Sequence, residues 1–304
     1  MQESMRYETI VSRPRYNGSG PSIPNTRVIE IEDEIRKWFE NPTKNQGNEV
    51  SKKVSSLGDQ YGYTPEFWSE IERVVKNAYR DASGKRIKEI LRRPELLDSL
   101  NFYLLRGYVV SQIINDQLRT EKEVVYRGPF DLPLEVTVHE DTKFKVPDGR
   151  YLELHVYNYG GIIEAGKLNE INLRRNEGSV NVDEAERVTQ IEGNGEIHAR
   201  RIKKARHHDG KLVVGDVNIL DISPHKGQEP TVVAKKIDRL IIYPFPPWNN
   251  NDIADINVFA RKIDRIHLHG GTYNVVGGEI GSLKIDKKDK NPLNTVYRGF
   301  EKLV

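Results

Sequence analysis

The sequence contains no cysteine, which excludes a disulfide framework, thiolate metal sites and cysteine nucleophiles. The chain also has no large excess of positive or negative charge. The 47 Lys and Arg residues are balanced by 45 Asp and Glu residues, so the net charge requires neither a nucleic-acid nor a membrane partner. No stretch approaches about 18 consecutive apolar residues, and the polar amino terminus lacks the apolar core of a signal peptide. We therefore expect a cytoplasmic protein or a virion component without a membrane span.

Sequence motifs of common catalytic sites are absent as well. There is no G-x-x-x-x-G-K-[ST] phosphate loop, no G-x-S-x-G nucleophile motif, no Asp-Asp pair and no Gly-His-Gly. Arg201-Ile202-Lys203 resembles a motif of polygalacturonase-like enzymes, which also need two carboxylates around the scissile bond. Here the three residues simply fit a repeat described below. The sequence predicts no enzyme and no cofactor.

The first part of the chain has the pattern of helices. Residues 1–27 are rich in Gly and Pro and predict an extended arm, and residues 28–123 predict a helical domain. Thr64-Pro65 is a typical helix start, with an N-cap hydroxyl before a proline at the first helical position. The run 94–118 is apolar around most of its circumference, so we expect one helix buried by neighbours or by another subunit.

From residue 124 onward the composition changes to strand-forming residues, and a short pattern repeats. The pattern is a small apolar residue, two polar residues, an aliphatic, two polar, an aliphatic, one polar and an aliphatic. Successive copies begin 17, 17, 15, 20, 26 and 17 residues apart, and the copy from Val182 needs one extra residue to fit. The seven copies begin at Ala165, Val182, Ala199, Val214, Ala234, Ala260 and Gly277.

A period of about 17 residues fits one turn of a parallel β-solenoid, in which the aliphatic residues of successive turns stack as core columns. The fold class is therefore α+β: a helical domain followed by a solenoid of about seven turns over residues 124–286, including a strand-rich cap at its start. Residues 287–304 form a C-terminal tail or cap. A leucine-rich-repeat-like solenoid is the alternative, because I237-D-R-L-I-I242 fits L-x-x-L-x-L, but turns of 15–17 residues are short for that class.

The turn length and the aliphatic columns over about residues 150–286 resemble those of parallel β-helices, and most nearly those of bactofilin-like polymer-forming solenoids. This resemblance implies self-assembly without a nucleotide. The long helical domain departs from the short tails of bactofilins.

Charged residues follow the small apolar position of each copy, with acidic and basic pairs alternating from Asp183-Glu184 to Lys235-Lys236. Opposite charges on adjacent strands stabilise a sheet, so this alternation supports the proposed register. It fails where Arg261-Lys262 follows Lys235-Lys236; either these residues bind an anion, or the longer intervals of 20 and 26 residues separate the charges. A basic stripe for nucleic acid or another polyanion would consist of Arg200, Arg201, Lys203, Lys235, Lys236, Arg261 and Lys262.

Two further groups are candidate sites. His267 and His269 fall on one strand face, as metal ligands could, but a polar corner or a satisfied core histidine is the favoured interpretation, and His207 falls in a core column. The segment Tyr243 to Trp248, which includes Phe245, is an aromatic, proline-rich insertion that predicts an interface loop, unless Phe245 and Trp248 fold back to cover a flank of the solenoid.

The leading function is a non-catalytic structural or assembly protein, such as a scaffold, a filament or a virion component, with copies of itself or other protein subunits as partners. A nucleic-acid or polyanion-binding protein is the first alternative. A polysaccharide-active β-helix enzyme is the second, and it would require a pair of carboxylates on adjacent turns.

Overall fold

A computed structural model of the chain describes residues 23–129, 131–224, 227–243, 255–269, 272–285 and 295–298. The chain divides into two compact units, one up to Val109 and one from Val110 onward. The first unit is helical, and the second is a parallel β-solenoid that begins with the last turns of a helix. The predicted class, a helical region followed by a β-solenoid, is confirmed. No helix of the described residues is long and apolar enough to cross a membrane.

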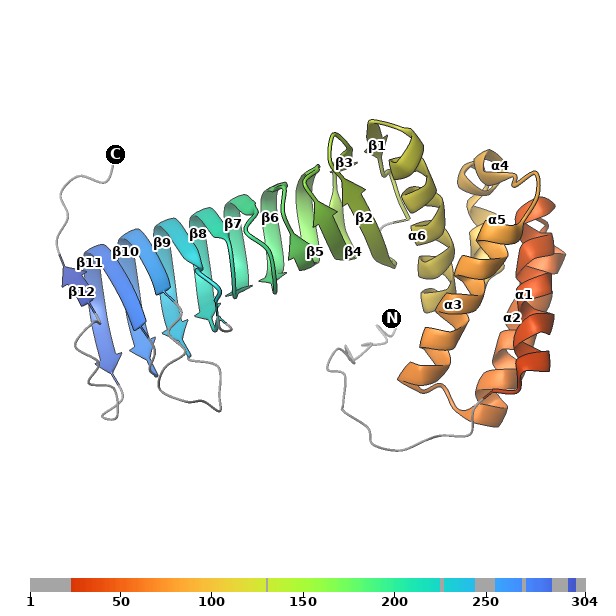
Figure 1. Cartoon of the computed structure of the whole chain (residues 1–304), viewed down its shortest axis with the longest axis horizontal. Helices are drawn as coiled ribbons and strands as arrows, with labels where there is room; N and C mark the ends of the chain where they lie inside the picture. Colours follow the sequence, from red (N-terminus) through yellow and green to blue (C-terminus); the bar gives the residue numbers. More distant parts are fainter. Residues whose placement is uncertain are drawn as a thin grey trace, which may run out of the picture. The chain divides into compact units, whose positions relative to one another are not determined.

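The helices form where apolar residues recur on one face. Among the described residues they are α1 (Asn25–Glu40), α2 (Lys44–Tyr61), α3 (Pro65–Asp81), α4 (Ile87–Arg92), α5 (Pro94–Asp98) and α6 (Tyr103–Thr120). In Figure 1, α1 lies alongside α2 and α3. The buried face of α1 includes Trp38 and Phe39. The predicted start of α3 is confirmed, because the Thr64 hydroxyl accepts a hydrogen bond from the Phe67 N–H at 3.2 Å.

The run 94–118 forms two helices, α5 and α6, where the sequence predicted one. The hydroxyl of Ser51, on α2, donates to the Ser99 carbonyl at 3.0 Å and accepts from the Asn101 N–H at 2.8 Å. The Ser99 hydroxyl itself donates to the Leu96 carbonyl at 2.6 Å. These hydroxyls pair backbone groups that a continuous helix would pair internally, so the chain can break there without leaving them buried and unsatisfied.

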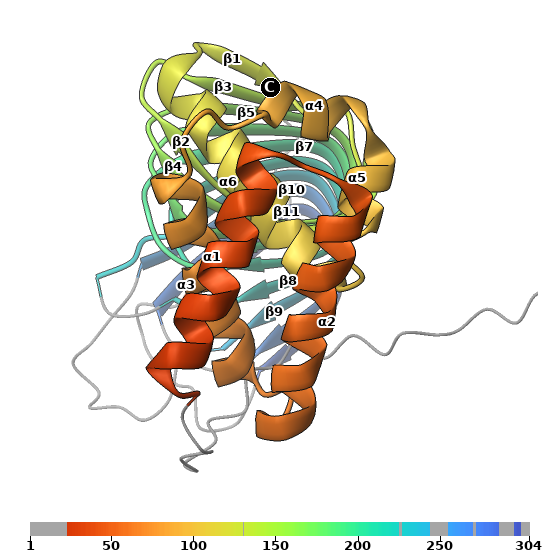
Figure 2. The same cartoon turned by 90° about the vertical axis from the view of Figure 1, so that its right-hand side faces the viewer.

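The second unit is a parallel solenoid of about eight turns, close to the seven predicted (Figure 1). Its strands are β1 (Glu123–Val125), β2 (Pro133–His139), β3 (Lys143–Val146), β4 (Gly149–Tyr159), β5 (Ile162–Asn176), β6 (Ser179–Gln190), β7 (Glu196–His207), β8 (Lys211–Ile222), β9 (Thr231–Ile242), β10 (Asp255–Leu268), β11 (Thr272–Ile285) and β12 (Thr295–Arg298). From β5 to β11 each strand follows one whole turn and pairs with the next. Figure 2 looks along the solenoid, whose turns lie one behind another. The additional turns lie before β5, where β1 pairs with β3, and β2 with β4.

The strand register reproduces the repeat found in the sequence. The small apolar positions are aligned from strand to strand: Ala165, Val182, Ala199, Val214, Ala234, Ala260 and Gly277. The extra residue predicted in the copy from Val182 is wrong, because Gln190, and not Ile191, is aligned with Leu173 and His207. A polar side chain thus occupies a core column, which the aliphatic pattern could not anticipate.

Each turn bends where the pairing of neighbouring strands is interrupted. Between β7 and β8 the ladder skips the position of Gly215, which lies at such a bend. A Cβ atom on Gly215 would lie 2.4 Å from the carbonyl oxygen of Arg200. Glycine at this bend therefore allows the two turns to approach closely. The aliphatic side chains between the bends are buried, as Ile202, Ile237 and Ile263 show.

Buried polar side chains hold the turns that follow several strands. Gln190 donates to the Gly193 carbonyl at 2.9 Å, and His207 Nε2 lies 3.0 Å from the Gly210 carbonyl oxygen. Asn158 bonds the residue three positions ahead of it in the same way. Each side chain supplies a partner to a peptide group that leaves the sheet at the turn.

The first turn of the solenoid is closed by the C-terminal part of α6, which belongs to the same unit. The Ser111 hydroxyl accepts from the Glu135 N–H at 2.9 Å. Asn115 donates to the Glu135 carbonyl at 2.9 Å and accepts from the Thr137 N–H at 2.7 Å. The outer edge of β2 therefore has side-chain partners in place of another strand, which prevents it from pairing with a further chain.

Candidate functional site

The predicted basic residues lie on the outside of the solenoid, at and beside the first bend of each turn. Arg201 on β7 is aligned with Glu184 on β6 and with Asp216 on β8, and Asp216 is aligned with Lys236 on β9. The alternation of acidic and basic residues predicted from the sequence is thus confirmed in three dimensions. Because adjacent strands lie about 4.8 Å apart, each charge has an opposite charge beside it.

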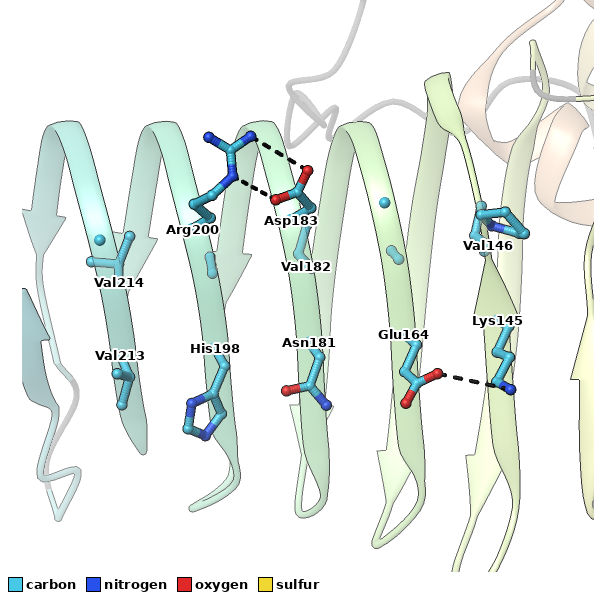
Figure 3. A pocket seen from close by; sticks show the side chains of 15 residues that line it. Lys145, Val146, Glu164, Asn181, Val182, Asp183, His198, Arg200, Val213 and Val214 are labelled. Atoms are coloured by element: carbon cyan, nitrogen blue, oxygen red, sulfur yellow. Dashed lines mark hydrogen bonds and ion pairs between the residues drawn. The ribbon is translucent and has the colours of Figure 1, made fainter.

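Carboxylates pair directly with several of these cations. Arg200 Nε donates to Asp183 Oδ1 at 2.6 Å (Figure 3). The same guanidinium also reaches Glu184. The hydrogen bonds from Arg200 to Asp183 and Glu184 raise the pKa of Arg200, and the same interaction lowers the pKa of Asp183. Lys203 on β7 and Glu186 on β6, which lie one turn apart, also form an ion pair, with 2.8 Å between Nζ and Oε2.

The two basic pairs that break the alternation are neighbours, because Lys236 and Lys262 are aligned on β9 and β10. The interpretation that the longer intervals separate these charges is therefore wrong: the additional residues lie between the strands and leave the register intact. Asp264 lies 3.5 Å from Lys236 Nζ and 3.9 Å from Lys262 Nζ, and Asp238 lies 2.6 Å from Lys236 Nζ. Carboxylates from the neighbouring positions thus balance the two lysines. Glu279 on β11 adds a pair with Lys262 at 3.3 Å.

The remaining members of the predicted stripe are exposed on the same strands. Arg201, Lys235 and Arg261 all have exposed side chains. The structure thus brings the seven basic residues together on neighbouring turns, but it interleaves acidic side chains among them. The surface is a mixed ladder of charges, and it lacks the field of a single sign that draws a polyanion.

A shallow groove of about 630 Å³ runs along β3 and β5–β8 beside this ladder. Figure 3 shows Lys145, Glu164, Asn181, His198 and Val213 following one another along it, one from each strand. Small apolar side chains such as those of Val182 and Val214 form its floor. The groove contains as many acidic as basic side chains and so favours no strongly charged ligand; the acidic side chains are Glu164 and Asp183, and the basic ones are Lys145 and Arg200.

Carboxylates on adjacent turns, as the enzyme alternative requires, occur at Asp238 and Asp264, which share Lys236, and at a second place. Glu153 on β4 is aligned with Glu170 on β5, and both burial and the neighbouring Glu170 raise the pKa of Glu153. Glu170 is nearly buried and accepts a hydrogen bond from Arg187 at 2.8 Å. Neither carboxylate lines the groove. Composition and local motifs did not reveal this pair; the register of β4 with β5 does.

The three histidines predicted as candidate ligands or core residues can all be placed. The rings of His267 and His269 lie on one strand face with centroids 3.8 Å apart, and Tyr243 stacks on His269 at 4.3 Å. No cluster of three or more potential metal ligands occurs among the described residues. His207 is buried in a core column, as the sequence predicted.

Of the predicted interface loop, only Tyr243 can be placed. Its side chain is 40% exposed, and its N–H donates to the Ile222 carbonyl at 2.9 Å, so the start of the loop is fixed to the previous turn. Phe245 and Trp248 lie outside the described residues.

No protein-family model matches the chain, and neither a curated protein nor a solved structure matches it significantly. The parallel β-solenoid is thus shown by the structure alone, and the finer resemblance to bactofilin-like proteins has no support from these comparisons.

Proposed function

We propose that this protein is a non-catalytic scaffold that acts within a protein assembly, in the cytoplasm or as a component of a virion. The mixed charge ladder carries this proposal. Each turn presents charges that pair with those of the next turn, as Arg200 does with Asp183 and Lys262 with Glu279. Such ion pairs connect neighbouring turns through their exposed side chains. A surface of this kind stabilises the solenoid, as a structural role requires.

The interior supports the same proposal. The turns are fixed by buried hydrogen bonds, such as those of Gln190 and His207, and β2 is closed by Ser111 and Asn115 of α6. Continuous aliphatic columns and hydrogen-bonded turns favour one rigid arrangement of turns. A rigid solenoid can hold bound proteins at fixed positions along its length.

Size-exclusion chromatography with multi-angle light scattering, repeated from low to high salt, tests the proposal. We expect a discrete oligomer whose mass is unchanged at high salt, because an assembly interface buries apolar surface that salt does not screen. A monomer at every salt concentration would overturn a role that depends on self-assembly.

A further inference from the structure

The two ends of the solenoid differ in how their strand edges are covered. At the first turn, side chains of α6 bond the edge of β2. At the last turn, β12 pairs only with Asn274–Gly277 of β11. Within the described part of the chain, no strand pairs with the outer edge of β11 from Gly278 to Ile285. This edge presents backbone groups in the geometry that another strand requires.

The core columns are also open at this end. Ile263 and Ile266 on β10 are 0% and 2% exposed. Their aligned partners on β11, Ile280 and Leu283, are only half-buried. The last described turn therefore exposes aliphatic side chains that every earlier turn covers with the next one.

The sequence of the open edge is complementary to itself. Read from either end, residues 279–284 (EIGSLK) give a charge, an aliphatic, two small residues, an aliphatic and the opposite charge. If two copies run antiparallel about a twofold axis between Gly281 and Ser282, Glu279 of each faces Lys284 of the other. The same arrangement places Ile280 opposite Leu283.

The shape of the turn agrees with this axis. The pairing of β10 with β11 skips Gly278 and Gly281, so the strand bends at both positions, and only the second bend lies within residues 279–284. A twofold axis at this second bend places residues 279–280 of one copy opposite residues 283–284 of the other. Glu279 is 74% exposed and contacts Lys262 of its own chain at 3.3 Å, while Lys284 is exposed. Both charges are accessible to a second copy.

We propose that a second copy of this chain pairs antiparallel with residues 279–284 of β11, giving a closed, twofold-symmetric dimer. Such an isologous contact uses the same surface on both copies. Because an isologous contact closes on itself, it does not continue into a filament. This inference rests on the proposed scaffold function and names its partner.

Charge reversal in the full-length chain tests the proposal, with the mass in solution measured by light scattering over a dilution series. Lys284→Glu and Glu279→Lys should each weaken the dimer by at least about tenfold, because each places like charges opposite one another twice. The double variant E279K/K284E should restore it, because both intermolecular pairs return with their signs exchanged. Arg206→Glu is the matched control, since Arg206 holds the repeat position of Lys284 on the distant strand β7 and should leave the dimer intact.

Each outcome decides between the proposals. A dimer that the single reversals weaken and the double variant restores supports the contact, with circular dichroism showing that all variants are folded. An oligomer that is insensitive to the reversals, or that grows into a polymer, overturns this contact while leaving the scaffold function standing. A wild-type monomer overturns this contact together with any scaffold role that depends on self-assembly.

Discussion

His207 illustrates how a single polar residue is accommodated in the core of the solenoid. Its ring is buried in a column that holds aliphatic side chains in later turns, such as Ile222 and Ile242. Burial lowers the pKa of His207 to about 4, with a smaller lowering contribution from His208, while the hydrogen bond to the Gly210 carbonyl opposes the shift. The folded protein therefore keeps this imidazole neutral at pH values where an exposed histidine is protonated.

This pKa predicts a dependence of stability on pH. Between pH 6.5 and about 4 the unfolded chain binds a proton at His207 that the folded chain does not, so the unfolding free energy decreases as the pH falls. The loss is up to about 3 kcal/mol. Urea unfolding of the wild type and of His207→Gln at pH 7 and pH 4.5 measures it as a difference.

Glutamine is the appropriate replacement, because Gln190 makes the equivalent bond to Gly193 one turn earlier. His207→Gln should keep the fold and lose less stability than the wild type on acidification. Equal losses in the two proteins would show that His207 does not titrate as described.

At the scale of the elements, α6 determines where the solenoid begins. Its final turns place Ser111 and Asn115 against the backbone of β2, in the position that a preceding strand would otherwise occupy. Ser111 and Asn115 are polar residues in a mostly apolar helix, and nothing in the local sequence marks them as capping residues. The sequence of α6 alone therefore indicates only an apolar helix. The contact also explains how the solenoid can start at β2 without exposing the edge of that strand.

Asn115→Ala should destabilise the solenoid by about 1–3 kcal/mol, because it leaves the Glu135 carbonyl and the Thr137 N–H without these partners. Urea unfolding measures the loss, and hydrogen exchange should show faster exchange of the Thr137 amide. Gln112→Ala on the same helix is the control and should change stability much less. An unchanged Thr137 exchange rate in Asn115→Ala would contradict the capping role.

At the scale of the whole molecule, the balance of acidic and basic residues in the composition recurs on the solenoid surface. The basic residues predicted as a stripe are near one another, but Asp183, Glu184 and Asp264 lie among them and pair with them. The charges of one turn are compensated by those of the next. Affinity for a polyanion requires several uncompensated cations, and this arrangement opposes it.

We therefore expect the wild-type protein to bind duplex DNA or heparin weakly at physiological salt. The double variant Asp183→Asn/Glu184→Gln should bind more tightly, because it releases Arg200 from both of its carboxylate partners. Fluorescence anisotropy across a salt series measures both affinities. Tight, steeply salt-dependent binding by the wild type would contradict the compensated ladder and restore the polyanion-binding alternative.

The local pattern of the sequence determined much of the architecture. The spacing of Ala165, Val182 and the later small residues predicted both the solenoid and the register of its strands, because each aliphatic column needs one residue per turn. Thr64-Pro65 predicted a helix start, because capping depends on adjacent residues. These features follow from interactions that repeat at a fixed interval or act within a few residues.

Other features were decided only by the tertiary structure, because they depend on which distant residues become neighbours. The break between α5 and α6 depends on Ser51 reaching residues about fifty positions away. Gln190 fits a core column because a turn supplies its hydrogen-bond partner, and Lys236 lies beside Lys262 because the intervening residues leave the register unchanged. The open edge of β11 can be identified only from the order in which the turns stack. Composition determines which residues the surface contains, while the stacking order determines which backbone edge and which aliphatic side chains remain exposed.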